Sequence, residues 1–166
     1  MRNIFIATSL ITVSLLSACS EGRPDFEYSC DVSTDGWGKS DTLTFPFHYP
    51  FLNISDTEAH SESFPQTLAL HLAFRYRPCL DMEDLSLHMR LIADDGKAIS
   101  GYKLKCQLTD DKGIPQGTGW GSLTTHEIDD LPYSIVLPDT GIYKLLVWPE
   151  KETGNIFSIT MGLTSE

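Results

Sequence analysis

The residues in this sequence whose types could do chemistry are mainly histidines, and their setting favours exposure to solvent over metal binding. His71 and His88 occupy outward positions of two alternating segments, so they could share a metal ion if those segments pair. In that pairing His71 falls nearer Arg90, a cation that opposes metal binding, and no Cys, Asp or Glu stands at ligand spacing. The sequence also contains no GxSxG segment and no pair of carboxylates in a catalytic frame. We therefore expect no enzyme activity, no cofactor and no metal site.

Acidic pairs occur at three strand ends beside Gly or Pro: Asp94-Asp95, Asp110-Asp111 and Asp129-Asp130. Such pairs could hold calcium, but they lack the dense, alternating oxygen ligands of a calcium loop. Aspartate side chains also bond to the backbone of tight turns, and this explanation requires no ligand. We expect these pairs to form turns.

The segment 117–123, GTGWGSL, and the three tryptophans are the remaining candidates for ligand binding. A phosphate-binding glycine loop needs a strand before it, a helix after it and usually a lysine, and none is evident. Glycines at alternate positions of a strand instead allow close backbone approach or a bulge. Trp37, Trp120 and Trp148 could stack on sugars, which would make the protein a glycan-binding module. The alternative is that these rings pack in the core.

The apolar run that ends at Cys19 indicates covalent attachment of lipid. Arg2 is followed by an apolar stretch from 4 to 16, which is shorter than the roughly 20 residues that span a bilayer. A charged start, a short apolar middle and small residues describe a secretory signal. The segment 16–19, LSAC, resembles a bacterial lipobox, in which Cys19 becomes the acylated first residue of the mature chain. The alternative is an ordinary signal peptide followed by a cysteine.

The predicted organisation is a lipoprotein signal peptide at 1–18, an acylated tether at 19–24 and one domain at 25–166. Two or three acyl chains would hold that domain on a membrane almost irreversibly. Ser20 resembles the second mature residue of lipoproteins sorted to the outer membrane. The segment 20–25 carries scattered acids, whereas surface-exported lipoproteins of Bacteroidota often carry an acidic cluster there. We expect an anchor in the outer membrane, with the domain on its periplasmic face.

Composition excludes several classes of partner. Removal of residues 1–18 leaves 148 of 166 residues, enough for one domain with a core. The chain has 12 Lys and Arg against 23 Asp and Glu, a formal net charge of −11. An acidic surface argues against nucleic acid and anionic headgroups as electrostatic partners. The sequence shows no second apolar segment of spanning length and no repeat of fixed period.

Alternation of apolar and polar residues dominates the chain after the signal. In 67–77 every second residue from Leu68 to Tyr76 is apolar, and 84–93 alternates in the same way, with a DDGK turn at 94–97. Further strands are predicted at 26–33, 41–48, 99–109, 119–128, 133–137, 142–148 and 155–164. No stretch has a helical period. About nine short strands with one apolar face predict an all-β fold, an antiparallel β-sandwich of jelly-roll or immunoglobulin-like type.

Three cysteines follow the lipidation site, and the oxidising periplasm predicts one disulfide and one thiol among them. If 67–77 pairs with 84–93, Tyr76 lies opposite Leu85, and the next hairpin sets Leu85 opposite Cys106. Cys79 then lies at the same end of the sheet, so a Cys79–Cys106 bridge is geometrically allowed within a Cα separation of about 7 Å. Cys30 alternates with apolar residues and is predicted to be a buried thiol. The alternatives are that Cys79 and Cys106 stay reduced, or that Cys30 pairs with one of them.

The chain resembles the GldH family of gliding-motility lipoproteins over most of its mature part. Its second half follows the order DxxGxxxGxGxGxI, PxxGxY and GxxxxGL almost completely. Cys79 and Cys106 depart from the family pattern. The matching residues are Cys19, Trp37 and the segments 41–45, 75–78, 85–87, 95–97, 104–108, 111–113, 117–122, 137–143 and 161–163.

The resemblance implies a lipoprotein of the Bacteroidota cell envelope that is needed for gliding in species that glide. Gliding in those species works alongside the type IX secretion machinery. The family has no attributed catalytic residues, and it includes members from non-gliding species. The resemblance therefore implies a compartment and a molecular system, with other envelope proteins of that machinery as partners.

Overall fold

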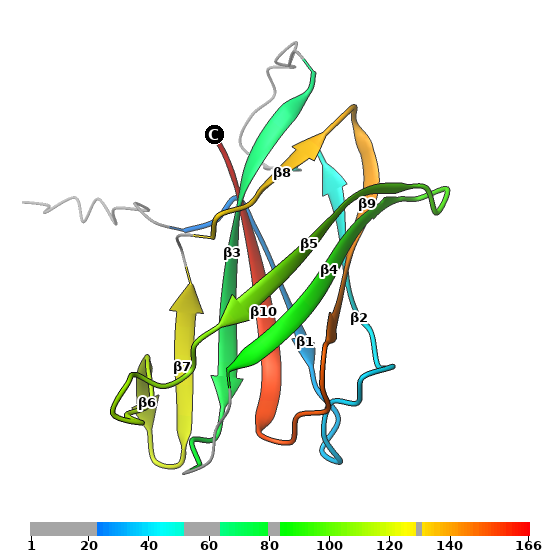
Figure 1. Ribbon diagram of the computed structural model, residues 1–166. Helices are drawn as coiled ribbons and strands as arrows, with labels where there is room; N and C mark the ends of the chain where they lie inside the picture. Colours follow the sequence, from blue (N-terminus) through cyan, green and yellow to red (C-terminus); the bar gives the residue numbers. More distant parts are fainter. Residues whose placement is uncertain (1–22, 52–63, 80–83, 129–130) are drawn as a thin grey trace, which may run out of the picture.

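The computed structural model describes residues 23–51, 64–79, 84–128 and 131–166 (Figure 1). Within these residues all regular secondary structure is β, and ten strands form two antiparallel sheets. The predicted signal peptide, the lipidation site Cys19 and the pair Asp129-Asp130 lie outside the described residues.

The two sheets pack face to face as an antiparallel β-sandwich, which confirms the predicted fold class. In Figure 1 the four-stranded sheet crosses in front of the six-stranded sheet. The four-stranded sheet has the order β2 (Leu43–Tyr49), β9 (Gly141–Pro149), β4 (Leu85–Ala93) and β5 (Ala98–Cys106). The six-stranded sheet has the order β1 (Phe26–Asp31), β10 (Ile156–Ser165), β3 (Gln66–Tyr76), β7 (Leu123–Ile128) and β6 (Thr118–Trp120), with β8 (Ser134–Leu137) also paired to β3.

The core forms where the apolar faces of the two sheets meet. Successive side chains of a strand point to opposite sides, so a period of two places all apolar residues of a strand on one face. In β3 the five predicted inward residues from Leu68 to Tyr76 are all buried, and in β4 so are Leu85, Leu87, Met89 and Leu91. The predicted inward faces of both strands are thus confirmed.

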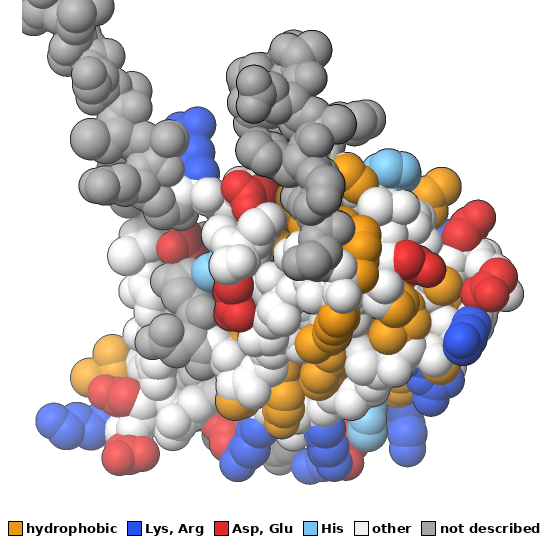
Figure 2. All heavy atoms as spheres, turned by 90° about the horizontal axis from the view of Figure 1, so that it is seen from above, with side chains coloured by type: hydrophobic (Ala, Val, Ile, Leu, Met, Phe, Trp, Pro, Cys, Tyr) orange, Lys and Arg blue, Asp and Glu red, His pale blue; other side chains and the backbone are white. Residues whose placement is uncertain are grey.

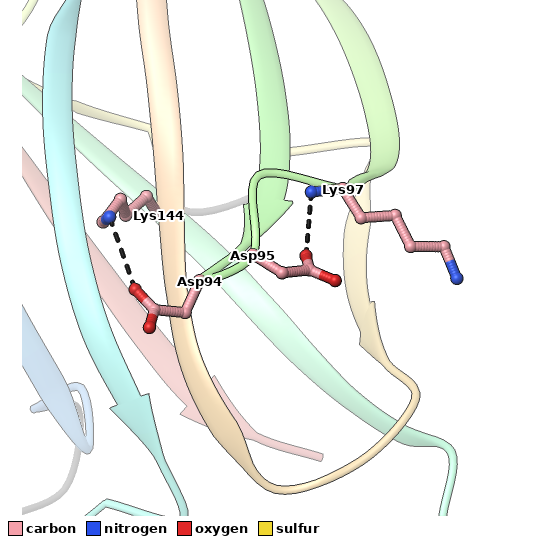
Figure 3. A network of polar contacts seen from close by, with 4 residues as sticks. All are labelled: Asp94, Asp95, Lys97 and Lys144. Atoms are coloured by element: carbon pink, nitrogen blue, oxygen red, sulfur yellow. Dashed lines mark hydrogen bonds and ion pairs between the residues drawn. The ribbon is translucent and has the colours of Figure 1, made fainter.

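The predicted hairpin between β4 and β5 is confirmed, and its aspartates form the turn (Figure 3). Gly96 has a positive φ of 84°, and the Lys97 backbone N–H donates to Asp95 Oδ1 at 2.9 Å. Lys144 on β9 reaches Asp94 Oδ1 at 3.5 Å, which links the turn to the neighbouring strand. The register places Leu85 opposite Cys106, as expected from the sequence.

The predicted pairing of 67–77 with 84–93 is wrong, because β3 and β4 belong to different sheets. The expectation relied on consecutive strands being neighbours, which holds in roughly two-thirds of cases. The chain instead crosses the sandwich between β3 and β4, so that both leucine-rich faces line one core. Tyr76 therefore pairs with Ile156 and Thr124, and His71 and Arg90 lie on opposite outer faces.

The single strand predicted at 119–128 is a hairpin of two strands, β6 and β7, which accounts for the tenth strand. Gly121 has a φ of 69° and begins the turn that returns the chain toward Leu123. A Cβ on Gly119 would overlap the Leu123 carbonyl oxygen, and one on Gly117 would overlap that of Thr125. The glycines of this segment therefore permit close backbone approach, as one of the sequence interpretations expected.

Candidate functional site

The outer face of the four-stranded sheet differs in charge from the rest of the molecule. None of its four strands contains an Asp or Glu, although the whole chain has 23. The same strands hold one arginine, three lysines and two histidines, all at positions that alternate with core residues. We call this surface the cationic face. Its members are Thr44, Pro46, His48, Ser86, His88, Arg90, Ile92, Gly101, Lys103, Lys105, Ile142, Lys144, Leu146 and Trp148.

Trp148 is at the centre of a ring cluster on the cationic face. It pairs across the strands with His88, and the two rings stack with centroids 5.5 Å apart and an interplanar angle of 11°. The guanidinium carbon of Arg90 lies 5.6 Å from the centroid of the Trp148 ring, within the range of a cation–π contact. A planar cation and a half-buried aromatic ring are thus presented together to the outside.

Acidic residues at the rim pair with the lysines of this face. Lys103 Nζ lies 2.7 Å from Glu150 Oε1, and Lys105 Nζ lies 2.7 Å from Asp84 Oδ2. The hydrogen bond from Lys103 lowers the pKa of Glu150, and the hydrogen bond to Asp84 raises the pKa of Lys105. Together with the Lys144–Asp94 contact, these pairs give all three lysines a carboxylate neighbour.

Arg90 differs from the lysines because no carboxylate among the described residues forms an ion pair with it. Its side chain is exposed and contacts the Trp148 ring. Seen end-on in Figure 2, blue Lys and Arg side chains line the lower border of the molecule, which is the side of the four-stranded sheet. Among the described residues, the cation of this face without a carboxylate partner is thus the one that contacts the Trp148 ring.

Apolar side chains extend along the same face from Arg90 toward the start of β9, where Pro46 and Ile92 flank Lys144. Ile142 is 47% exposed, and Pro46, Ile92 and Leu146 are half-buried on the same face. In the register of the sheet Leu146 lies opposite both Thr44 and Arg90. Lys144 lies among these aliphatic residues, and the tryptophan and arginine beside them are residue types enriched at protein–protein interfaces.

The opposite outer face, on the six-stranded sheet, carries the start of the described chain. A Cβ on Gly162 would lie 3.1 Å from two side-chain carbons of Pro24, so the glycine allows this segment to lie against β10. Asp25 Oδ2 accepts a hydrogen bond from the Ser165 backbone N–H at 2.8 Å. His71 is also on this face, where its Nε2 lies 3.1 Å from Thr164 Oγ1. The predicted tether thus joins the domain on the side away from the cationic face.

The three described cysteines are free thiols. Cys106 is buried, and burial, with Asp84 as a second cause, raises the pKa of its thiol to about 12. Cys79 is exposed, and Cys30, predicted to be buried, is half-buried with its Sγ 3.3 Å from the Thr44 carbonyl oxygen. The predicted Cys79–Cys106 disulfide is not confirmed and stays a prediction.

A cleft of about 620 Å³ lies at the end of the sandwich beside Cys79. Lys105 and Asp84 line this cleft and form an ion pair with each other. The Cys79 Sγ lies 3.2 Å from Asn155 Nδ2, and an amide cannot accept the proton of a thiol as a general base. Among the described residues, the hydrogen-bond partner of the Cys79 thiol is thus an amide and not a base.

The structure separates the three tryptophans proposed to stack on ligands. Trp37 is 1% exposed, and its Nε1 donates to the Asp41 carbonyl oxygen at 2.8 Å, so it has no ring face open to a ligand. Trp148 lies on the cationic face, and the side chain of Trp120 lies outside the described residues. Trp148 is thus the described tryptophan that keeps a candidate binding role.

The other polar candidates have structural roles where they are described. Asp110 Oδ1 accepts hydrogen bonds from the backbone N–H groups of Lys112 and Ile114, at 2.9 and 2.8 Å, and so forms a turn as expected. In the described ranges, no group of three His, Cys, Asp or Glu side chains could hold a metal ion. The same ranges contain no helix that is long and apolar enough to cross a membrane.

Sequence reasoning missed the association of Arg90 with Trp148. The predicted pairing of 67–77 with 84–93 places Arg90 only near His71, whereas β3 and β4 belong to different sheets. The absence of acids from the strands of one sheet is visible in the sequence, but its significance depends on which strands share that sheet. The sequence therefore shows that these strands lack acidic residues, but it does not show that the strands form one sheet.

Of the comparisons with known proteins, the one with family models identifies the family, and the similar solved structures are distant. The model of the GldH lipoprotein family matches residues 26–160. No curated protein sequence matches the chain. A family GH115 4-O-methyl-α-glucuronidase with specificity for decorated arabinogalactans has 13% identity and a TM-score of 0.37, covering 84% of this chain and 17% of that one. The VP2 subviral particle of infectious bursal disease virus has 14% identity and a TM-score of 0.33, covering 86% of this chain and 31% of that one. The chain spans less than a third of each of these two proteins.

Proposed function

The chain belongs to the GldH lipoprotein family, and on that premise we propose that it is a lipid-anchored, non-enzymatic component of the gliding and secretion-associated machinery of the outer membrane. In this role the β-sandwich is a scaffold that binds other envelope proteins. The observation that carries the proposal is the family match over residues 26–160, which includes nearly all of the described domain.

The anchor in this proposal is Cys19, acylated after the signal peptide is removed. The LSAC segment at 16–19 supports it, and Ser20 with the scattered acids of 20–25 supports the periplasmic face of the outer membrane. Each buried methylene of an acyl chain contributes about 0.8 kcal/mol to membrane binding, so two or more chains give stable anchoring.

A binding role without catalysis is supported by the chemistry of the described surface. The exposed Cys79 has an amide neighbour, and two of the charged residues of the adjoining cleft, Lys105 and Asp84, form an ion pair with each other. The cationic face, in contrast, combines Trp148, Arg90 and Ile142 on one sheet surface. Such residues are enriched at interfaces between proteins.

Replacement of the lipidated cysteine tests this function. We expect Cys19→Ala to move the protein from the membrane to the soluble fraction and to abolish gliding or secretion in a host that depends on it. Cys79→Ala is the matched control, because it removes an exposed thiol of the domain, and it should remain in the membrane fraction. A Cys19→Ala protein that stays with the membrane and still functions would contradict the proposal.

A second candidate function is glycan binding, which one observation favours: Trp148 lies half-buried on an outer face beside Arg90. Titration of the purified domain with envelope polysaccharides, followed by tryptophan fluorescence, tests it. A saturable change in the wild type that is lost in Trp148→Phe would support this function. An unchanged spectrum would exclude it for the sugars used.

A further inference from the structure

We propose that Arg90 and Trp148 anchor a protein–protein interface on the cationic face, and that the partner places a carboxylate against Arg90 beside an apolar side chain. This inference rests on the proposed function, because it specifies the chemistry of the partner that the scaffold binds. The partner is a folded envelope protein with an Asp or Glu at the centre of its contact surface.

The shape and composition of the face support a protein as the partner. It is the outer surface of a sheet, with Ile142 exposed, Trp148 half-buried, and Lys144 and Leu146 between them on β9. Tryptophan and arginine are the residues most enriched among those that dominate binding energy, and they gather near the centre of an interface. The rim pairs, such as Lys103 with Glu150, would supply the polar border.

Charge complementarity identifies the group that meets Arg90. The lysines of the face already have carboxylate neighbours, whereas Arg90 has none among the described residues. A guanidinium offers a planar fork of N–H donors that fits a carboxylate with two parallel hydrogen bonds. The four strands supply no such carboxylate themselves, so the partner must provide it.

The position of the tether argues against lipid headgroups as the anionic partner. Pro24 lies against Gly162 on the outer face of the other sheet, and Cys19 precedes Pro24 by five residues. The chain between them can span at most about 18 Å. The tether therefore leaves the domain from the six-stranded sheet, and the cationic face is on the other side of a sandwich whose sheets lie about 10 Å apart.

Site-specific photocrosslinking in the native host tests the proposal on the full, membrane-bound protein. A photoreactive amino acid replaces Ile142 on the cationic face or, as the matched control, Val136 on the other sheet. These positions are 47% and 45% exposed, so their accessibility is nearly equal. We expect a protein adduct at position 142 and not at 136, with a crosslinked peptide next to an Asp or Glu of the partner.

Charge reversal then tests the role of Arg90. Arg90→Glu should reduce the adduct at position 142 at least tenfold, while Arg75→Glu, an exposed cation on the other outer face, should leave it unchanged. Replacing the partner's carboxylate with Lys should restore the adduct of the Arg90→Glu protein. Trp148→Ala should also reduce it at least tenfold, and unchanged thermal unfolding of each variant shows that the fold is intact.

The outcomes separate this inference from the function on which it rests. Protein adducts at 136 alone, an adduct at 142 that Arg90→Glu does not change, or an adduct to lipid or polysaccharide would overturn the inference. The scaffold function would survive the first two results. Absence of protein adducts from both positions would contradict the inference and count against the scaffold function as well.

Discussion

The hydroxyl of Tyr143 closes the turn between β8 and β9. It donates toward the Asp139 carbonyl oxygen at 2.7 Å and toward Asp139 Oδ1 at 2.5 Å, and the ring is buried. Burial, followed by the hydrogen bond to the Asp139 carboxylate, raises the pKa of Tyr143 from 10 to about 12. The folded state therefore holds this proton more tightly than the unfolded state does.

Tyr143→Phe should lower the free energy of unfolding by about 1–3 kcal/mol at neutral pH, because the buried tyrosine loses its hydrogen bond to the charged Asp139 carboxylate. The stabilisation by this group is complete below pH 10 and is lost as pH rises from 10 to about 12. The difference between wild type and variant in urea unfolding should therefore shrink over that range. Tyr28→Phe, at a 40% exposed ring, is the control, and an equal loss there would refute the assignment.

The cysteines should differ in reactivity toward iodoacetamide at pH 8. Cys79 is exposed and should be alkylated in the native protein, whereas Cys106 is buried with a pKa raised to about 12 and should react only after unfolding. Mass spectrometry of the labelled peptides reports both sites. If neither cysteine reacts even in denaturant until a reductant is added, the disulfide predicted from the sequence is present.

At single residues the sequence predicted burial better than contacts. The alternation that placed Leu68 to Tyr76 inside depends only on local geometry, so it could be recognised directly. The burial of Trp37 and the outward position of Trp148 could not be recognised, because Trp37 lies between two glycines in a polar segment, whereas Trp148 follows an aliphatic run. The backbone of Trp37 forms an isolated β-bridge with Thr153, a residue more than 100 positions away in the sequence.

At the scale of elements, the hairpin of β6 and β7 depends on glycine. Gly117 has a φ of 102°, and a Cβ there would lie 2.8 Å from the His126 Cα and overlap a carbonyl oxygen. Gly117→Ala should therefore cost about 1–3 kcal/mol through strain and loss of pairing. Urea unfolding measures the cost, and amide hydrogen exchange should show lost protection in β6 and β7.

Gly154→Ala is the matched control for this prediction, since no atom lies within 4 Å of its Cβ position. Its effect should stay within about 0.5 kcal/mol. Equal stability of the two alanine variants would mean that the close approach at Gly117 is not required for the fold.

The strands themselves were largely predictable from the sequence, whereas the pairing of strands within each sheet was not. Period-two alternation located the strands and the chemistry of the 94–97 turn fixed one hairpin with its register, because both signals are local. The crossing between β3 and β4 carries no such signal, and β9 enters the four-stranded sheet between β2 and β4 from far along the chain. The candidate site was the least predictable part, because the cationic face forms only when these four strands pair in one sheet.

At the scale of the molecule, the two outer faces of the sandwich have different proposed roles. The six-stranded sheet receives the segment that leads from the predicted anchor, with Pro24 against Gly162. The four-stranded sheet presents Arg90 and Trp148 on the other side. A domain held in this way can remain on the membrane while it binds a second protein.

The most direct test of this account is crosslinking of the tagged, lipid-anchored protein in its native cells, followed by gentle detergent extraction and mass spectrometry. The account predicts recovery of gliding or secretion proteins in stoichiometric amounts, with contact peptides from β4 and β9 and none from the tether side. Recovery of abundant porins alone would contradict the scaffold function and make glycan binding through Trp148 the leading hypothesis.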